Sequence, residues 1–298
     1  MALLHELAVL FPNEPYFLGD TMGVMGDPAR HLFMTAAVAT LADLERPLRV
    51  LEIGSWIGFS TLTWAQALED LPHKGTILCI DPWASYWSPE EVQAGGVMAT
   101  MDFMSRADLS YNLFRHNLGF APRSIRIDHM RGRSADILPY LADGAFDLIF
   151  VDGDHRYSAV AVELRAADRL LADGGLLCGD DLEQQTPAAE CAGMDPAVHY
   201  TQDARTGVRY HPGVTRAVAE EIDPSTKVVG DANIARLFVM GVGMRTHTGV
   251  AKRMFGALAQ RGINISMINT SEVRVSVVVD RDRGEEALAC LKETFRVI

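Results

Sequence analysis

Short apolar runs that end in glycine or aspartate recur up to about residue 182, and segments with helical spacing separate them. Runs of this kind are typical of buried parallel strands, because helices cover both faces of a parallel sheet. Strands that alternate with helices predict an α/β fold with a Rossmann-like, doubly wound sheet. The predicted strands span residues 49–53, 76–80, 124–129, 146–151 and 176–179, and the predicted helices span about 34–41, 61–68 and 158–171.

The hydrophobic pattern changes near residue 232. An apolar run at 235–240 is followed by residues 250–260, whose apolar side chains share one helical face. Residues 273–279 then alternate valine with other side chains, and residues 287–295 show helical spacing again. This order of elements predicts a small ferredoxin-like βαββαβ domain.

These patterns predict two domains. The first spans residues 1–231 and includes a helical N-terminal cap over about 1–47, and the second spans residues 232–298. A polar segment of about thirty residues that starts near residue 183 is expected to be a lid or a mobile binding loop. After it we expect the last two strands of the first sheet, at 227–229 and 235–240, although the second domain also claims the latter.

The composition is that of an ordinary globular protein, with 48% hydrophobic and 22% charged residues among 298. We expect a cytoplasmic protein without a membrane partner, because there is no apolar run of about 18 residues and no basic start of a signal peptide. The net charge of −12 disfavours nucleic acid and favours a small-molecule substrate. The four cysteines show no paired spacing, so we expect buried, reduced thiols.

A glycine turn with the pattern Glu52-x-Gly54-x-x-x-Gly58 follows the first strand. Open α/β sheets bind their ligands at this end of a strand. A dinucleotide site requires G-x-G-x-x-G, and the third glycine is missing here, which disfavours NAD. Asp81 ends the second strand, where an acid accepts hydrogen bonds from both ribose hydroxyls. Asp81 therefore predicts a nucleoside ligand without choosing between NAD and another cofactor.

Four carboxylates follow the fourth and fifth predicted strands, namely Asp152, Asp154, Asp180 and Asp181. Because these strands are neighbours in such a sheet, the four carboxylates should lie close together at one opening of the ligand cleft, the carboxylate mouth. If these like charges meet in a partly dry cleft, either the pKa values of some of the carboxylates are raised or a cation lies among them. Oxygen ligands at a substrate mouth favour magnesium or calcium, with some waters retained.

Motifs at the ends of these strands resemble one known family. They are Glu52-Ile53-Gly54, Ile80-Asp81-Pro82, residues 150–157, and Gly174-Gly175 with Asp180-Asp181. In these motifs the chain resembles the class I S-adenosylmethionine-dependent methyltransferases, in the cephalosporin-hydroxylase-like and macrolide-type branch of small-molecule O-methyltransferases. The likeness covers about residues 30–222 and implies S-adenosyl-L-methionine as the cofactor.

The resemblance implies a catalytic and a metal site. Asp152, Asp180 and Asp181 fall where the related catechol-type enzymes hold magnesium, and His155 falls where they place the general base. We therefore expect His155, Asp152 and Asp154 to be catalytic. The alternative for His155 is a histidine at a helix start that bonds to Asp152 or to the backbone.

The same resemblance implies which residues contact the cofactor. In such enzymes the turn after the third strand contacts the adenine, which places Arg133 and Ser134 at the base. Trp83 lies just after the second strand. Its position is as compatible with lining the cofactor or substrate site as with packing in the core. The full predicted set is Glu52, Gly54, Ser55, Gly58, Ser60, Asp81, Pro82, Trp83, Arg133, Ser134 and Asp152.

The C-terminal segment resembles a second family. Residues 240–251 (Met-Gly-Val-Gly-Met-Arg-Thr-His-Thr-Gly-Val-Ala) and 262–273 (Gly-Ile-Asn-Ile-Ser-Met-Ile-Asn-Thr-Ser-Glu-Val) are similar to the ACT regulatory domain of aspartate kinases. Nothing in the chain resembles the kinase itself. The resemblance implies a homodimer through this domain and either an amino-acid effector or dimerisation alone. The implied effector residues are Asn264, Ile265, Thr270, Ser271 and Glu272, with the backbone of residues 245–249.

Three functional hypotheses remain. The first is an S-adenosylmethionine-dependent O-methyltransferase for a small hydroxylated metabolite, assisted by magnesium, with an ACT module for amino-acid sensing or dimerisation. The second is a non-catalytic amino-acid-binding regulatory protein that uses the methyltransferase fold as a scaffold. The third, an NAD-dependent oxidoreductase, lacks the glycine it requires. A further possibility is a fused or misjoined gene in which the first sheet lost its final strand.

Overall fold

The computed structural model contains two compact units, Met1–Thr226 and Lys227–Ile298. The domain boundary predicted between residues 231 and 232 falls outside the described residues and stays a prediction. The structure describes residues 14–17, 28–42, 44–184, 191, 193–195, 197–204, 207–222, 234–240, 250–265, 267–271 and 274–295.

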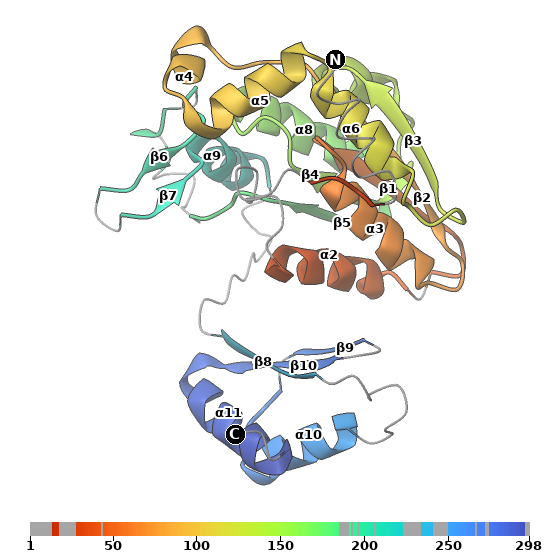
Figure 1. The fold of residues 1–298 in the computed structure, drawn as a ribbon, viewed down its shortest axis with the longest axis vertical. Helices are drawn as coiled ribbons and strands as arrows, with labels where there is room; N and C mark the ends of the chain where they lie inside the picture. Colours follow the sequence, from red (N-terminus) through yellow and green to blue (C-terminus); the bar gives the residue numbers. More distant parts are fainter. Residues whose placement is uncertain are drawn as a thin grey trace. The chain divides into compact units, whose positions relative to one another are not determined.

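A five-stranded parallel sheet forms the centre of the first unit (Figure 1). Its strands are β1 (Leu48–Ile53), β2 (Gly75–Asp81), β3 (Arg126–Arg131), β4 (Phe146–Val151) and β5 (Leu171–Gly179). The strand order is β3-β2-β1-β4-β5, and all neighbouring strands are parallel. The order reverses between β1 and β4, so the ligand crevice of such a sheet lies at their carboxyl ends. The predicted α/β fold is confirmed.

Two strands differ in extent from their predictions. β3 begins and ends two residues later than predicted, since it pairs with β2 as far as Asp81. β5 begins at Leu171 instead of residue 176, directly after the preceding helix. Residues 173–175, between the predicted helix and the predicted strand, instead lie within β5, where the register against β4 shifts.

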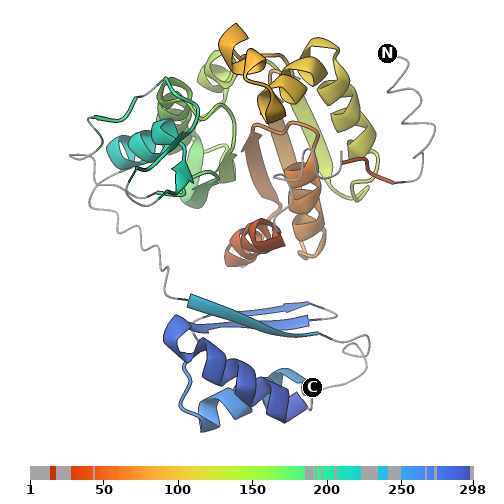
Figure 2. The same cartoon turned by 60° about the vertical axis from the view of Figure 1, so that its left-hand side comes forward.

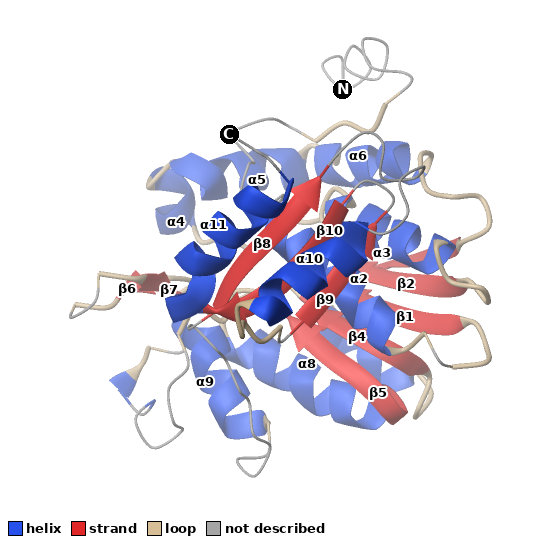
Figure 3. Cartoon of the chain, turned by 90° about the horizontal axis from the view of Figure 1, so that it is seen from below, coloured by secondary structure: helices blue, strands red, loops and turns tan. Residues whose placement is uncertain are grey.

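Helices cover both faces of this sheet, among them α2 (Pro28–Thr40), α3 (Phe59–Glu69), α6 (Leu109–Leu118) and α8 (Tyr157–Leu170). Figure 3 shows strands β1, β2, β4 and β5 side by side. Residues of β1 alternate between the faces: Leu48 and Val50 pack with α2, α3 and α6, whereas Leu51 and Ile53 pack with α8. This alternation explains why the strands read as continuous apolar runs.

The remaining described elements of the first unit surround the carboxyl edge of the sheet. They are α4 (Pro89–Gln93), α5 (Gly96–Arg106), α7 (Ser134–Ile137), the 3-10 turn η2 (Leu138–Tyr140), β6 (Thr201–Gln202), β7 (Arg209–Tyr210) and α9 (Pro212–Glu221). The antiparallel pair β6–β7 lies within the predicted lid segment. Val214 and Ala217 of α9 pack on Val160 and Leu164 of α8, which fixes α9 beside the end of β4.

Of the two further strands expected for the first sheet, one can be compared with the described residues. Residues 227–229 lie outside the described part of the chain. The apolar run at 235–240 belongs to a strand of the second unit, so its assignment to the first sheet was wrong. Among the described residues, β5 forms one edge of the first sheet.

The second unit contains a three-stranded antiparallel sheet with two helices (Figure 2). Its elements are β8 (Ile234–Met240), α10 (Val250–Gln260), β9 (Met267–Ser271), β10 (Arg274–Asp280), the 3-10 turn η4 (Arg281–Arg283) and α11 (Gly284–Phe295). The sheet order is β8-β10-β9, and both helices lie on one face of it. Val275, Val277 and Val279 are buried under these helices. The described elements follow the predicted βαββα order, without its last strand.

The four cysteines are free thiols, and three of them are buried, as expected for a reduced protein. No helix in the described part of the chain has the length and apolarity needed to cross a bilayer.

Candidate functional site

The turn after β1 joins the carboxyl ends of the three central strands. The backbone N–H of Gly54 donates to Ile80 of β2 at 2.9 Å, and the N–H of Asp152 donates to Ile53 of β1 at 2.8 Å. Gly54 has φ +88°, and a Cβ at this position would overlap the backbone carbonyl of Asp152. Only glycine therefore lets the turn approach the end of β4 this closely.

Glu52 holds the turn from inside the protein. Its carboxylate is fully buried and accepts hydrogen bonds from the hydroxyls of Ser55, at 2.7 Å, and Thr61. Burial raises the pKa of Glu52, although these hydroxyls oppose the shift. The Glu52 and Ser55 side chains bond to each other, and their cofactor contacts stay predictions. Ser60 is buried as well, at 8% exposure.

Asp81 lies at the end of β2 beside this turn. Its two carboxylate oxygens accept hydrogen bonds from the backbone N–H groups of Trp56, at 2.9 Å, and Trp83, at 2.6 Å. Burial is the main reason that the pKa of Asp81 is raised to about 6. Each oxygen retains a second lone pair, so the predicted role of Asp81 toward ribose hydroxyls stays a prediction.

The Trp83 side chain belongs to the core, not to a ligand wall. It is fully buried, and its ring lies 4.6 Å from that of Phe114 and 5.0 Å from that of Tyr111. Its indole N–H donates to the backbone carbonyl of Trp56 at 2.6 Å. The prediction of a cofactor contact through this ring is therefore wrong, while Pro82 beside it is half-buried.

The two residues predicted at the adenine lie after β3. Arg133 is exposed and precedes helix α7. The Ser134 hydroxyl donates to Glu163 at 2.6 Å, and burial raises the pKa of that carboxyl to about 7. The adenine contacts of both residues stay predictions.

The carboxylate mouth contains a cation that the sequence reasoning missed. Arg30 of α2 forms ion pairs with Asp152 and with Asp180, the latter at 2.9 Å. Asp154 pairs with Arg156 at 3.0 Å. The convergence of all four carboxylates therefore stays a prediction for Asp154.

Asp181 is bound to histidine. Its carboxylate lies 2.9 Å from Nε2 of His155 and 3.8 Å from Nδ1 of His211. The residues predicted to hold magnesium therefore do not fit the ion in this arrangement, since Arg30 neutralises Asp152 and Asp180 while His155 occupies Asp181.

His155 lies between β4 and α8, and two carboxylates dominate its charge state. Burial alone would lower its pKa, but the carboxylates of Asp152 and Asp181 outweigh burial and raise the pKa of His155 to about 10. Its pairing with Asp181 in turn holds the pKa of Asp181 below its usual range, against the opposing effect of burial. Near neutral pH, His155 is thus an imidazolium and must lose its proton before it can act as a base.

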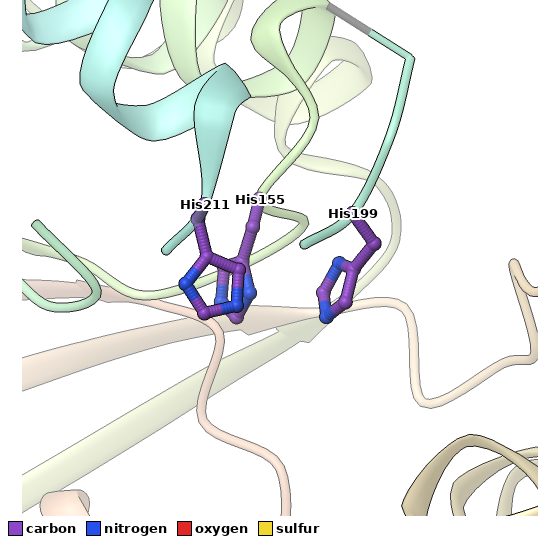
Figure 4. Close-up of side chains that lie close together, drawn as sticks. All are labelled: His155, His199 and His211. Carbon is purple, nitrogen blue, oxygen red and sulfur yellow. The ribbon is translucent and has the colours of Figure 1, made fainter. Parts of the chain in front are cut away.

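Two further histidines pack against His155 (Figure 4). The ring centroids of His155 and His199 lie 4.7 Å apart in a stacked arrangement, and those of His155 and His211 lie 4.5 Å apart. His211 precedes Pro212, the first residue of α9, where proline favours a helix start. A Cβ at Gly213 would overlap the His155 backbone, so the glycine allows α9 to approach it.

The effector residues predicted in the second unit are only partly described. Asn264 is exposed and Ile265 is half-buried, both after α10. Thr270 and Ser271 end β9, but their side chains lie outside the described part. Glu272 and residues 245–249 lie outside it altogether, so the effector site stays a prediction.

A Rossmann-like α/β protein with a parallel central sheet is the class that this fold defines. Family models agree with that class: residues 51–182 match a methyltransferase domain, and residues 237–295 match an ACT domain. The first unit therefore contains a methyltransferase domain, and the second unit is an ACT domain.

Curated relatives match the ACT part of the chain. An aspartokinase of Pseudomonas aeruginosa is 51% identical over 71 residues, which is 24% of this chain and 17% of the relative. An aspartate kinase of Pseudomonas fluorescens is 48% identical over 84 residues, which is 28% of this chain and 20% of the relative. The chain thus spans about a fifth of the length of these kinases.

Solved structures show likeness to each part. An O-methyltransferase from Bacillus cereus in complex with SAH is 14% identical, with a TM-score of 0.39 over 94% of this chain and 97% of that one. A putative O-methyltransferase from Klebsiella pneumoniae is 19% identical, with a TM-score of 0.37 over 81% and 90%. The regulatory subunit of aspartate kinase from Thermus thermophilus is 40% identical, with a TM-score of 0.21 over 22% and 43%.

Proposed function

We propose that this protein is a cytoplasmic O-methyltransferase that transfers a methyl group from S-adenosylmethionine to a hydroxyl of a small metabolite. The observation that carries the proposal is the Gly54 turn at the point where the strand order reverses. It lies beside Asp81, and its close approach to Asp152 brings it to the mouth that contains His155.

Different residues of the chain would have different roles in this methyl transfer. The sulfonium cofactor supplies an already activated methyl group, so the protein mainly has to orient the acceptor and remove its proton. Asp81 would accept hydrogen bonds from the ribose hydroxyls. His155 would take the acceptor's proton once its own proton has left.

The proposal includes magnesium as an ion that assists the methyl transfer. Its binding requires Arg30 to withdraw from Asp152 and Asp180, because a guanidinium and a metal ion compete for the same oxygens.

The ACT domain supports two roles in the proposal. Aspartate kinases carry the matching segment as a small part of a longer chain, so the kinases' activity does not come with it. We propose that the domain joins two chains into a homodimer and that an amino-acid effector binds at Asn264, Ile265, Thr270, Ser271 and Glu272.

Thermal denaturation with S-adenosylhomocysteine tests the cofactor claim. We expect the product to raise the melting temperature of the parent protein, because binding to the native state stabilises it. In the Asp81→Asn variant, which keeps the size of the side chain, the shift should fall. A parent protein that shows no shift would contradict the cofactor claim.

The ACT match favours one second candidate, a non-catalytic amino-acid-binding regulatory protein. It predicts that a panel of amino acids stabilises the protein while S-adenosylhomocysteine has no effect. The same denaturation experiment therefore distinguishes the two candidates.

A further inference from the structure

Three histidines from separate segments meet beside the carboxylate mouth. His155 follows β4, His199 precedes β6, and His211 precedes α9. One ligand atom from each lies within 4.8 Å of the others (Figure 4). Such convergence from positions 155, 199 and 211 is not a product of helical or strand spacing, so tertiary packing must maintain it.

The surrounding residues hold these rings in place. Trp87 packs edge-on against His199 with ring centroids 4.6 Å apart, and the carboxylate of Glu183 lies 2.9 Å from Nδ1 of His211. Asp181 binds Nε2 of His155 at 2.9 Å. Carboxylates in these positions are typical partners of metal-binding histidines, because they fix the ring orientation and raise the basicity of the other nitrogen.

Two buried nitrogens of this histidine cluster have no hydrogen-bond partner in the described part of the chain. Nδ1 of His155 and Nδ1 of His199 are buried, and neither has a hydrogen-bond partner among the described residues. A buried polar atom without a partner costs about 1–3 kcal/mol, so an unexplained pair of them points to a missing ligand.

The chemistry of the donors selects the kind of ligand. Imidazole nitrogens suit zinc and other divalent transition metals, whereas magnesium and calcium prefer oxygen. We propose that His155, His199 and His211 bind a divalent transition metal of the Zn²⁺ type, with Asp181 as a supporting carboxylate. This site shares Asp181 with the predicted magnesium ligand set of Asp152, Asp180 and Asp181, but its proposed metal ligands are three histidines outside that set.

Metal binding and the protonation of His155 compete. A metal ligand must be a neutral imidazole, so binding displaces the proton that His155 otherwise shares with Asp181. His199 is already neutral, because burial and the neighbouring positive groups lower its pKa to about 3. A metal-bound His155 cannot also act as the base, so in that state the ion would lower the pKa of the acceptor hydroxyl instead. That last role rests on the proposed methyltransferase activity, whereas the site itself does not.

Zinc titration of the chelator-treated full chain tests the site. We expect one Zn²⁺ per chain by calorimetry and by metal analysis after dialysis, and no comparable binding of Mg²⁺. Co²⁺ in place of Zn²⁺ should give a visible absorption band that reports nitrogen coordination. His199→Ala and His211→Ala should each weaken Zn²⁺ binding at least about tenfold, since even supporting residues contribute that much.

His73→Ala is the matched control, because His73 is exposed and distant in sequence from the cluster. Zn²⁺ binding should be unchanged in it. Circular dichroism establishes that each variant is folded, and His199→Gln and His211→Gln replace any alanine variant that is not. Zn²⁺ binding that is absent from the parent, or equal in the parent and the folded cluster variants, would overturn the proposal.

S-adenosylhomocysteine binding to the same samples separates this proposal from the proposed function. If the product binds and Zn²⁺ does not, the metal site is wrong and the methyltransferase proposal stands. If Zn²⁺ binds and the product does not, the metal site stands without that function.

Discussion

The charge on His155 decides how the candidate site works. Its folded-state pKa lies above the unperturbed value of about 6.5, because Asp152 and Asp181 stabilise the imidazolium. The protonated pair therefore contributes stability that is fully present below pH ~6.5 and is lost as pH rises through about 10. A base with this pKa gains activity toward alkaline pH.

Asp181→Asn should move that dependence to lower pH. The variant removes a negative charge 2.9 Å from Nε2 of His155, so the pKa of His155 falls. We expect the alkaline-rising limb of kcat/KM to shift toward neutral pH. Glu183→Gln is the control, because Glu183 contacts His211 instead, and its limb should stay in place. An unshifted limb in Asp181→Asn would remove His155 from the role of base.

Arg30→Gln should destabilise the protein and open the carboxylate mouth to magnesium. Without the guanidinium, Asp152 and Asp180 repel each other, and we expect a loss of about 1–3 kcal/mol in the free energy of unfolding. Added Mg²⁺ should restore part of this loss in Arg30→Gln and have little effect on the parent, as measured by urea denaturation.

Arg126→Gln is the matched control for that experiment. Its ion pair with Asp128 is exposed on both sides, so we expect a change below about 1 kcal/mol and no Mg²⁺ effect. Equal responses of the two variants to Mg²⁺ would show that the carboxylate mouth is not a cation site.

At the scale of elements, the turn between β1 and α3 is the most constrained part of the first unit. Gly54→Ala combines a positive φ with overlap between the new Cβ and the Asp152 backbone. Gly174→Ala has a similar φ of +75°, but a Cβ there would contact nothing within 4 Å. We expect Gly174→Ala to cost roughly 1–2 kcal/mol, and Gly54→Ala to cost clearly more and to abolish S-adenosylhomocysteine binding.

Chemical denaturation and calorimetry measure the two effects side by side. If Gly54→Ala binds the product as the parent does, the turn is not part of the cofactor site.

The sequence predicted the elements better than the contacts among them. The β1 and β4 strands were clear because both faces are buried, and Asp152 and Asp181 followed from strand order. Arg30 and His199 gave no signal, because α2 and the segment before β6 reach the site only through tertiary packing. His211 could have been noted, since Pro212 marks a helix start beside it. Trp83 was ambiguous because an aromatic residue after a strand fits a core as well as a ligand wall.

At the scale of the whole molecule, the chain combines a methyltransferase domain with an ACT domain. The core of the second unit lies between one face of a three-stranded sheet and two helices. A domain this small buries little apolar area on its own. Association with a second copy would add buried area, and it is the reason we expect a homodimer.

Light scattering of the full chain should give the mass of a dimer, and a chain that ends at residue 226 should be monomeric. The truncated chain should still bind S-adenosylhomocysteine, because the residues of the candidate site lie in the first unit. A monomeric full chain, or a dimeric truncated chain, would contradict dimerisation through the ACT domain.

Calorimetric titration of the full chain with S-adenosylhomocysteine, and separately with NAD, tests the central claim most directly. The glycine turn without a third glycine, together with the methyltransferase match, predicts saturable binding of one S-adenosylhomocysteine per chain and no binding of NAD. A folded protein that binds NAD, or that binds neither ligand, would contradict the assignment of this site to S-adenosylmethionine.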